Sequence, residues 1–341
     1  MLVAPRALGI GSCLPADVHG WGPGLEFNIR KRKRAAEARK IFAPEDLKFL
    51  LQLPAFAIVS LFVPERGWGA ICLSMERLGS VSFAPQDGGV LQTLRSFGLV
   101  GDDHLRRVRA TRHEHHIQIV RERLGGWSPA IALQGIEHLE AAQDGGHGAV
   151  LWIAHFSFNA LAAKMAFARA GFEVFHVSRP EHGFTKSRFG IRFLNPIRSG
   201  AELRYAAGRI VIDRADPAAS MNEARRLLRA NKFVSITAGA WEGEMLVKAR
   251  VGESAVEMAS GAPRLARIAG APLLPVFVVR DDSTGKLHVT GERPIDLTRH
   301  RDKAEMIQSA AQDFADRHLP YLQSWPHQWR DWEKLTAFTA R

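Results

Sequence analysis

From residue 129 onward the chain alternates short apolar runs with segments that have a helical pattern of apolar residues. The clearest run, residues 149–154, precedes a helical pattern over 161–170 that ends at Gly171. A short apolar run predicts a buried strand, and a glycine after a periodic segment is typical of a helix end. Further strands are predicted at 173–177, 209–212, 233–237, 272–279 and 287–290, and helices at 136–143, 222–229, 262–269 and 303–318. This alternation favours an α/β fold with a mixed central sheet flanked by helices, in which 287–290 is an edge strand.

One histidine stands where such a sheet usually carries its chemistry. His155 follows the strand predicted at 149–154, so it would lie at the carboxyl end of that strand, where α/β sheets bind their ligands. An imidazole in that place can act as a general base toward a hydroxyl or an amine. The alternative is a buried structural histidine whose two ring nitrogens are both hydrogen-bonded.

The charge of the chain limits the kinds of partner that it can have. The 341 residues carry a net charge of +11, which indicates nucleic acid, anionic lipid, or an acidic or thioester substrate. No nucleic-acid recognition motif accompanies this charge, and the sequence has neither a GxGxxG motif nor a Walker loop. We therefore expect no nucleic-acid partner. Cys13 and Cys72 offer neither a disulfide framework nor a metal site.

The N-terminal part of the chain favours contact with a membrane surface. Residues 1–46 are expected to form a poorly ordered leader that contains the basic run 30–34. The apolar residues 47–63 are interrupted by Lys48 and Pro54, which makes them too short and broken for a span of about 20 apolar residues. We expect residues 47–100 to form a helical, membrane-associating segment that lies in the interface, and residues 101–335 to form the α/β domain. The alternatives are a solvated face for the basic run and core packing for the helix.

A basic helix predicted over residues 102–124 carries the cluster His113-Glu114-His115-His116. Its spacing is not the HExxH of zinc enzymes, and no cysteine or acid stands at a typical zinc distance. We therefore expect no metal site and interpret the cluster as solvated or as facing an anion.

Several short motifs follow one another in a recognisable order. They are His155-Phe156, Arg179-Pro180, Asp213-Arg214 before a helix-strand unit, the segment 260–280, and Ser324-Trp325-Pro326-His327-Gln328-Trp329 near the end. In their order and spacing, over residues 47–332, the chain resembles the lipid A lauroyl/myristoyl acyltransferase family, part of the lysophospholipid acyltransferase group.

The resemblance implies transfer of a fatty acyl chain from an acyl carrier protein or coenzyme A thioester to a hydroxyl of a lipid or lipid-like acceptor. It implies a glycerolipid acyltransferase-like fold, no cofactor and no metal. It also implies a place at the cytoplasmic face of the bacterial inner membrane, as a peripheral protein or with a single N-terminal anchor. The expected partners are an anionic membrane lipid surface and an acyl carrier protein. In this family a histidine deprotonates the acceptor, and a carboxylate five residues later orients the imidazole.

The chain departs from the family pattern at that carboxylate, because Ala160 stands five residues after His155. Loss of the orienting acid leaves the tautomer of the ring to another acceptor. Three outcomes are open. Glu181, Glu242 or Glu244 supplies the acid; Asn159 or a main-chain carbonyl orients the ring; or the chain is a catalytically impaired homologue that binds lipid or acyl carrier without transfer.

The expected site combines this base with groups that would hold the substrates. We expect His155 as the general base, with Asn159 and Glu242 as its catalytic partners. The residues expected to bind substrate are Phe156, Ser157, Phe158, Arg179 and Arg214. Arginine suits phosphate groups, whereas the two phenylalanines would line an acyl groove or the core.

Overall fold

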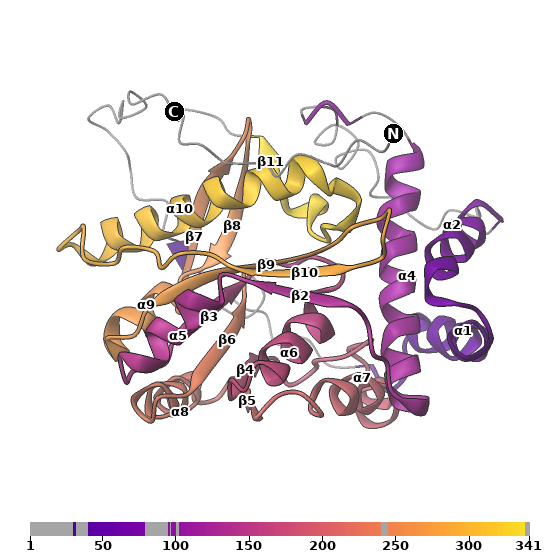
Figure 1. Cartoon of the computed structure of the whole chain (residues 1–341), viewed down its shortest axis with the longest axis horizontal. Coiled ribbons are helices and arrows are strands. Elements are labelled where there is room, and N and C mark those ends of the chain that lie inside the picture. The colour runs from indigo at the N-terminus through magenta and orange to yellow at the C-terminus, as the bar shows by residue number, and fades with distance from the viewer. Residues whose placement is uncertain are drawn as a thin grey trace, which may run out of the picture.

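A seven-stranded sheet forms the centre of the computed structural model, which describes residues 30–31, 40–78, 95, 97–99, 102–239 and 245–337. The strand order is β2-β10-β9-β3-β6-β4-β5 (Figure 1). Five neighbouring strands, from β9 to β5, are parallel, whereas β10 runs antiparallel to β9 and parallel to β2. The strands are β2 (Ile131–Gln134), β3 (Val150–Ile153), β4 (Val174–Ser178), β5 (Gly208–Val211), β6 (Phe233–Thr237), β9 (Leu273–Arg280) and β10 (Leu287–Gly291). The predicted mixed sheet flanked by helices is confirmed.

Helices cover both faces of this sheet. On one face lie α4 (Asp102–Gly125), α5 (Ile136–Asp144), α6 (Asn159–Arg169) and α7 (Asn195–Glu202), and α1 (Pro44–Phe62) and α2 (Trp68–Leu78) pack on α4 at the right of Figure 1. On the other face lie α8 (Pro217–Arg229), α9 (Gly261–Ala269) and α10 (Lys303–Ser324). Short helical turns occur at Glu65–Gly67, Gly190–Leu194, Pro326–Gln328 and Trp332–Lys334.

The central strand β3 is buried on both faces. Trp152 and Ala154 belong to the core under α10, whereas Leu151 and Ile153 belong to the core under α6. A parallel strand covered on two sides reads as a continuous apolar run, because both sets of alternating side chains leave water. This explains why β3 could be predicted from the sequence.

A second, antiparallel sheet lies beside α10 and has the strand order β1-β7-β8-β11. Its strands are β1 (Arg30–Lys31), β7 (Met245–Val251), β8 (Ser254–Ala259) and β11 (Thr336–Ala337). None of these strands was predicted, because β1 and β11 have two residues each and the polar residues of β7 and β8 break their apolar runs. The hairpin β7–β8 helps to form the site described below.

The prediction that residues 287–290 form an edge strand is wrong. β10 lies between β9 and β2, and β2 occupies the edge. The sequence pattern missed β2 because its four residues are only partly buried or exposed, so no apolar alternation marks them.

The histidine cluster of α4 was expected to be solvated or to face an anion, and the solvated alternative is wrong. The side chain of His115 is fully buried, and the ring of His116 contacts the rings of Phe49 and Phe56 from α1. Because α1 packs on this part of α4, the polar residues of the cluster lie between the two helices instead of facing solvent.

Parts of the N-terminal prediction lie outside the described residues. These are residues 1–29 and 32–39 of the leader, with Cys13, and residues 79–94, 96 and 100 of the segment predicted at 47–100. In the segment predicted at 47–100, α1 continues through Pro54, and one face of it packs on α4 through Phe49 and Phe56. Among the residues that the structure describes, no helix combines the length and the apolar character that crossing a bilayer requires.

Alanine substitutions at two glycines test how closely the residue after β2 approaches the end of β10. Gly135 has φ +70°, and a Cβ there would overlap the carbonyl group of Gly291 at the end of β10. Gly126 has φ +84°, but a Cβ there meets no atom within 4 Å. We expect Gly126→Ala to lower the free energy of unfolding by about 1–2 kcal/mol through backbone strain. Gly135→Ala should lower it further, by about 2–5 kcal/mol in all, because overpacking adds about 1–3 kcal/mol to the strain. Urea unfolding measures both, and equal losses would contradict the close approach.

Candidate active site

His155 lies directly after β3, at the carboxyl end of the parallel strands. The backbone just before it is fixed, because Ala154 N–H donates to the Val276 carbonyl of β9 at 2.8 Å. The amide Nδ2 of Asn159, the first residue of α6, donates to the Ala154 carbonyl at 2.9 Å. The imidazole side chain is 15% exposed, so it is mostly buried but reachable.

The Nδ1 atom of His155 faces a carboxylate that no motif or spacing in the sequence marks. Asp331 Oδ2 lies 2.9 Å from Nδ1, and the Asp331 side chain is only 5% exposed. The other carboxylate oxygen, Oδ1, accepts a hydrogen bond from Lys334 Nζ at 2.8 Å. Since an ionised carboxylate only accepts hydrogen bonds, we assign the proton of the neutral ring to Nδ1. Both oxygens of Asp331 are therefore engaged, and the ring has a fixed tautomer.

A short backbone ladder brings Asp331 to this place. Ser157 N–H donates to the Gln328 carbonyl at 2.7 Å, and Arg330 N–H donates to the His155 carbonyl at 3.3 Å. Phe156 and Trp329 form an antiparallel bridge between these two bonds. The segment after α10 is thus paired with the segment after β3, residue by residue.

Gln328 fastens the same segment to the end of β9. Its side chain is fully buried, its Oε1 accepts from the Arg280 N–H at 2.8 Å, and its Nε2 donates to the Arg280 carbonyl at 2.7 Å. The Gln328 side chain therefore forms the two main-chain hydrogen bonds that a neighbouring strand would otherwise form with Arg280. This is the physical role of the glutamine in the closing Pro-His-Gln-Trp motif.

Helix α4 holds the segment from the other side. Thr111 Oγ1 donates to the His327 carbonyl at 2.9 Å, and Arg112 Nη2 donates to the Arg330 carbonyl at 2.6 Å. Within the segment, Trp332 Nε1 donates to the Pro326 carbonyl at 2.9 Å. These bonds restrain Asp331 without using its own side chain, which leaves the carboxylate for His155.

Burial and the neighbouring charges set the protonation of the pair. Burial lowers the pKa of His155 to about 4, against the opposing attraction of Asp331 for the imidazolium. Burial alone would raise the pKa of Asp331, but His155 and Lys334 outweigh it and hold that pKa well below its usual range. Near pH 7 the site therefore contains a neutral imidazole beside an ionised carboxylate, which is the state that a general base requires.

A small cavity, partly open to solvent, adjoins this pair. The described residues that line it are Ala154, His155, Ala238, Gly239, Val256, Glu257, Met258, Phe314, His318, Trp329, Asp331 and Lys334. The lining is thus largely apolar around a few polar groups, as in many sites for organic ligands.

The residues proposed as partners of His155 lie in different places. Asn159 is close, but it binds the Ala154 carbonyl, and the ring of His155 is not among its hydrogen-bond partners. In the structure the amide holds the backbone before His155, and a catalytic role of Asn159 stays a prediction. Glu181 binds Arg214 through two bonds of 2.6 and 2.7 Å. Glu242 and Glu244 lie outside the described residues.

The expected substrate-binding residues divide in the same way. Phe156 and Phe158 are fully buried in the cores on opposite faces of the sheet, and the guanidinium of Arg280 lies 4.7 Å from the Phe158 ring centre. Ser157 is also fully buried, and its Oγ is 3.4 Å from Thr111 Oγ1. These three residues build the core instead of lining the described cavity. Arg214 is paired with Glu181, as described above.

Arg179 lies nearer to the reacting pair. Burial lowers the pKa of Lys334, and the positive charge of Arg179 contributes to that shift. Its main-chain carbonyl also accepts a hydrogen bond from Arg209 Nη2 at 2.6 Å. A substrate contact by Arg179 stays a prediction.

NMR titration of the His155 ring tests the arrangement. In the unaltered protein we expect a pKa of about 4. In Asp331→Asn the pKa should fall further, because the anion that stabilises the imidazolium is lost while burial remains. A rise of the pKa toward 6.5 in this variant would show that the ring is solvated and not held as described.

Comparisons with known proteins identify the family of the chain. The model of the family described as "Bacterial lipid A biosynthesis acyltransferase" matches residues 108–329, which include His155. None of the curated proteins compared matches the chain. Among solved structures, the chain is similar to the 1-acyl-sn-glycerophosphate acyltransferase PlsC from Thermotoga maritima, with 11% identity, a TM-score of 0.39, and coverage of 82% of this chain and 98% of that chain. Because the family match spans more than half of its length, the chain belongs to the bacterial lipid A biosynthesis acyltransferase family.

Proposed function

We propose that the protein transfers a fatty acyl chain from an acyl carrier protein or coenzyme A thioester to a hydroxyl of a lipid or lipid-like acceptor, with His155 as general base. The family assignment supports acyl transfer to lipid substrates. The observation that carries the proposal for this chain is the hydrogen bond of 2.9 Å between His155 Nδ1 and Asp331 Oδ2. It restores an orienting carboxylate where Ala160 had removed the expected one.

The proposed reaction uses the pair in two proton transfers. With Nδ1–H held by Asp331, Nε2 is the nitrogen that takes the proton from the acceptor hydroxyl as its oxygen attacks the thioester carbonyl. The tetrahedral intermediate then expels the thiolate, and the imidazolium returns the proton to the sulfur. The products are an ester and a free thiol, so the reaction needs no cofactor. Asp331 stays ionised throughout and stabilises the transient imidazolium.

The other reading of the sequence, a homologue that binds lipid or acyl carrier without transfer, has less support. A binding protein has no need to fix one tautomer of a partly accessible histidine. Here bonds from Gln328, Thr111 and Arg112 hold the segment that carries Asp331. The Asn159 amide holds the main chain just before His155. That degree of positioning is characteristic of a group that reacts.

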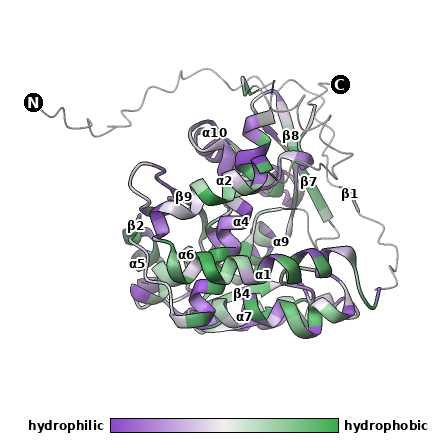
Figure 2. Cartoon of the chain, turned by 90° about the vertical axis from the view of Figure 1, so that its right-hand side faces the viewer, coloured by the Kyte–Doolittle hydropathy of each residue, from purple (hydrophilic) through white to green (hydrophobic). Residues whose placement is uncertain are grey.

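We further propose that the protein binds the cytoplasmic face of the bacterial inner membrane as a peripheral protein. One face of α1 is apolar and exposed, through Leu47, Leu51, Ile58, Leu61 and Phe62, and Figure 2 shows its hydrophobic residues along the helix. We call these five residues the α1 surface. An exposed apolar helix face beside basic residues fits the interface of an anionic bilayer.

A distant segment extends the α1 surface. Phe189 N–H donates to the Ile41 carbonyl at 2.9 Å, and the Phe189 ring lies between Phe42 and Phe193, with ring centres 5.2 and 5.1 Å away. Phe193 is 61% exposed. The exposed cations Lys40, Lys48, Lys186, Arg188 and Arg192 come from the same two segments. Apolar residues would enter the interface while these cations contact anionic headgroups.

Replacing the orienting acid should separate catalysis from binding. We expect Asp331→Asn to lower kcat by about 10²–10⁴-fold, by analogy with the orienting aspartate of serine proteases. The acid limb of the pH–rate profile should also move below the pKa of about 4 expected for His155. Asp331→Glu should recover part of the rate. The assay follows acyl transfer from a thioester to membrane lipid by mass spectrometry.

The neighbouring carboxylate of Glu333 provides the matched control, since it is about half exposed and lies 3.5 Å from Arg112 Nη2. Glu333→Gln should keep the rate and the pH profile of the parent, whereas His155→Gln should lose activity. Equal rates for Asp331→Asn and Glu333→Gln, or full activity of His155→Gln, would reject the assignment.

Charges placed on the α1 surface should weaken membrane binding. Leu51 and Ile58 are 73% and 59% exposed, so neither contributes much to the core. We expect Leu51→Glu/Ile58→Glu to reduce binding to phosphatidylglycerol-containing vesicles at least tenfold in co-sedimentation. Burying even one leucine side chain stabilises by about 1.5–3 kcal/mol. The control is Ile268→Glu on α9, at a position of 55% exposure. A similar loss in both proteins, or none in the double variant, would remove the α1 surface as the contact.

A further inference from the structure

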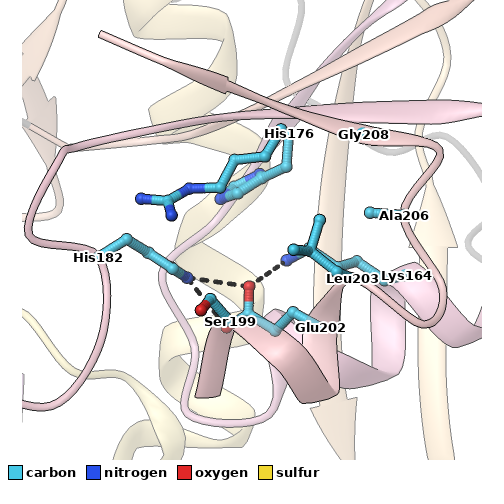
Figure 3. A pocket seen from close by; sticks show the side chains of 9 residues that line it. Lys164, His176, His182, Ser199, Glu202, Leu203, Ala206 and Gly208 are labelled. Atoms are coloured by element: carbon cyan, nitrogen blue, oxygen red, sulfur yellow. Dashed lines mark hydrogen bonds and ion pairs between the residues drawn. The ribbon is translucent and has the colours of Figure 1, made fainter. Parts of the chain in front are cut away.

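A second, small cavity that is partly open to solvent is shown in Figure 3. It lies on the face of the central sheet that carries α6 and α7, whereas the cavity beside His155 lies on the face that carries α10. Its polar lining includes Lys164 of α6, His176 of β4, His182 of the following loop, Glu202 of α7 and Arg209 of β5. The proposed reaction uses none of these side chains, although five separate segments bring them together.

Glu202 is the only carboxylate among the described residues that line this cavity, and its oxygens are already bound. Lys164 Nζ and His182 Nε2 each lie 2.9 Å from Oε2, and Arg198 Nε lies 2.7 Å from Oε1. Figure 3 shows His182 and Lys164 directed at Glu202 from two sides. The single negative charge of Glu202 is therefore shared by two permanent cations, Lys164 and Arg198.

Arg209 adds a third cation whose hydrogen-bond partners are neutral. Its Nε donates to Ser178 Oγ, and its Nη2 donates to the Arg179 carbonyl at 2.6 Å. Burial lowers the pKa of His176 and of His182, so neither ring adds a charge near pH 7. Lys164, Arg198 and Arg209 against Glu202 leave an excess of two positive charges. Lys164 and Arg198 are largely buried and Arg209 is partly buried, so water screens this excess only in part and the excess favours an anion.

The same residues could suggest a metal ion, because ligand atoms of His176, His182 and Glu202 all lie within 4.8 Å of one another. His176 Nδ1 is also 3.0 Å from Ser235 Oγ, as in many metal-bound histidines. However, a divalent cation on Glu202 would meet the charges of Lys164 and Arg198 on the same carboxylate. Repulsion from these fixed cations opposes a metal and attracts an anion.

We propose that this cavity binds a phosphate group of one of the two substrates. A guanidinium, an ammonium and imidazole rings are the usual donors to phosphate oxygens. The assignment of this phosphate to a substrate rests on the proposed function. It is argued from two interactions of Arg179. The carbonyl of Arg179 binds Arg209 at the cavity, and its charge acts on Lys334 at the active site. A phosphate on the lipid acceptor and a phosphopantetheine phosphate on the thioester donor share this chemistry.

Calorimetric titration of the full chain with inorganic phosphate, at ionic strength held constant with chloride, tests the site. We expect saturable binding that is at least tenfold weaker in Arg209→Gln and intermediate in Arg209→Lys, which keeps the charge but not the planar fork. Arg226→Gln is the matched control, because Arg226 is an exposed arginine of α8 whose described partner is Glu223. It should bind phosphate like the parent. Unchanged affinity in Arg209→Gln, or saturable binding of Zn²⁺ but not of phosphate, would overturn the anion site.

Competition identifies the source of the phosphate. Inhibition of acyl transfer by phosphate that is relieved by excess acceptor lipid would assign the site to the acceptor, and relief by excess thioester would assign it to the donor. Phosphate binding without competition against either would overturn the assignment to a substrate. His155→Gln should bind phosphate with the parent affinity, so loss of the proposed activity and loss of the anion site remain distinguishable.

Discussion

The hydrogen bond between His155 and Asp331 joins side chains 176 residues apart, and much of the fold around it serves to keep that distance at 2.9 Å. β3 delivers the histidine, and α10 delivers the segment that carries the acid. Each end is then held through its main chain, by Asn159 on one side and by Gln328 on the other. A carboxylate on the helix after the histidine would be positioned by one turn of that helix. Here the same orientation depends on the tertiary packing of α4, β9 and the C-terminal segment.

This difference explains which parts of the site could be predicted from the sequence. His155 and β3 were found because local rules are enough: a buried parallel strand gives an unbroken apolar run, and its carboxyl end is where chemistry gathers. Asp331 has no local signal, since no spacing along the chain relates it to His155. Gln328 of the closing motif could be singled out only through the resemblance to the family. Its bonds to both backbone groups of Arg280 give the physical reason for that motif.

The same limit applies to the fold, because only the features with a local sequence signal could be predicted. Strands covered on two faces were identified, whereas β2, β7 and β8 were not, because partly exposed strands have polar residues in their runs. The histidines of α4 show the converse error. Their polar letters indicated a solvated face, but α1 covers them with Phe49 and Phe56. The sequence shows that these side chains are polar. It does not show that a helix distant in the sequence packs over them.

Charge balance distinguishes the two faces of the sheet. Beside His155, the negative charge of Asp331 is matched by Lys334, and burial keeps the imidazole neutral. A neutral hydroxyl and a neutral thioester can therefore approach His155 while Asp331 stays paired with Lys334. On the other face Glu202 balances only one of three cations. This excess of positive charge, most of it shielded from water, is the basis of the anion site proposed there. In the proposed division of labour, the reacting groups lie beside the paired Asp331, and an anionic part of a substrate lies in the second cavity.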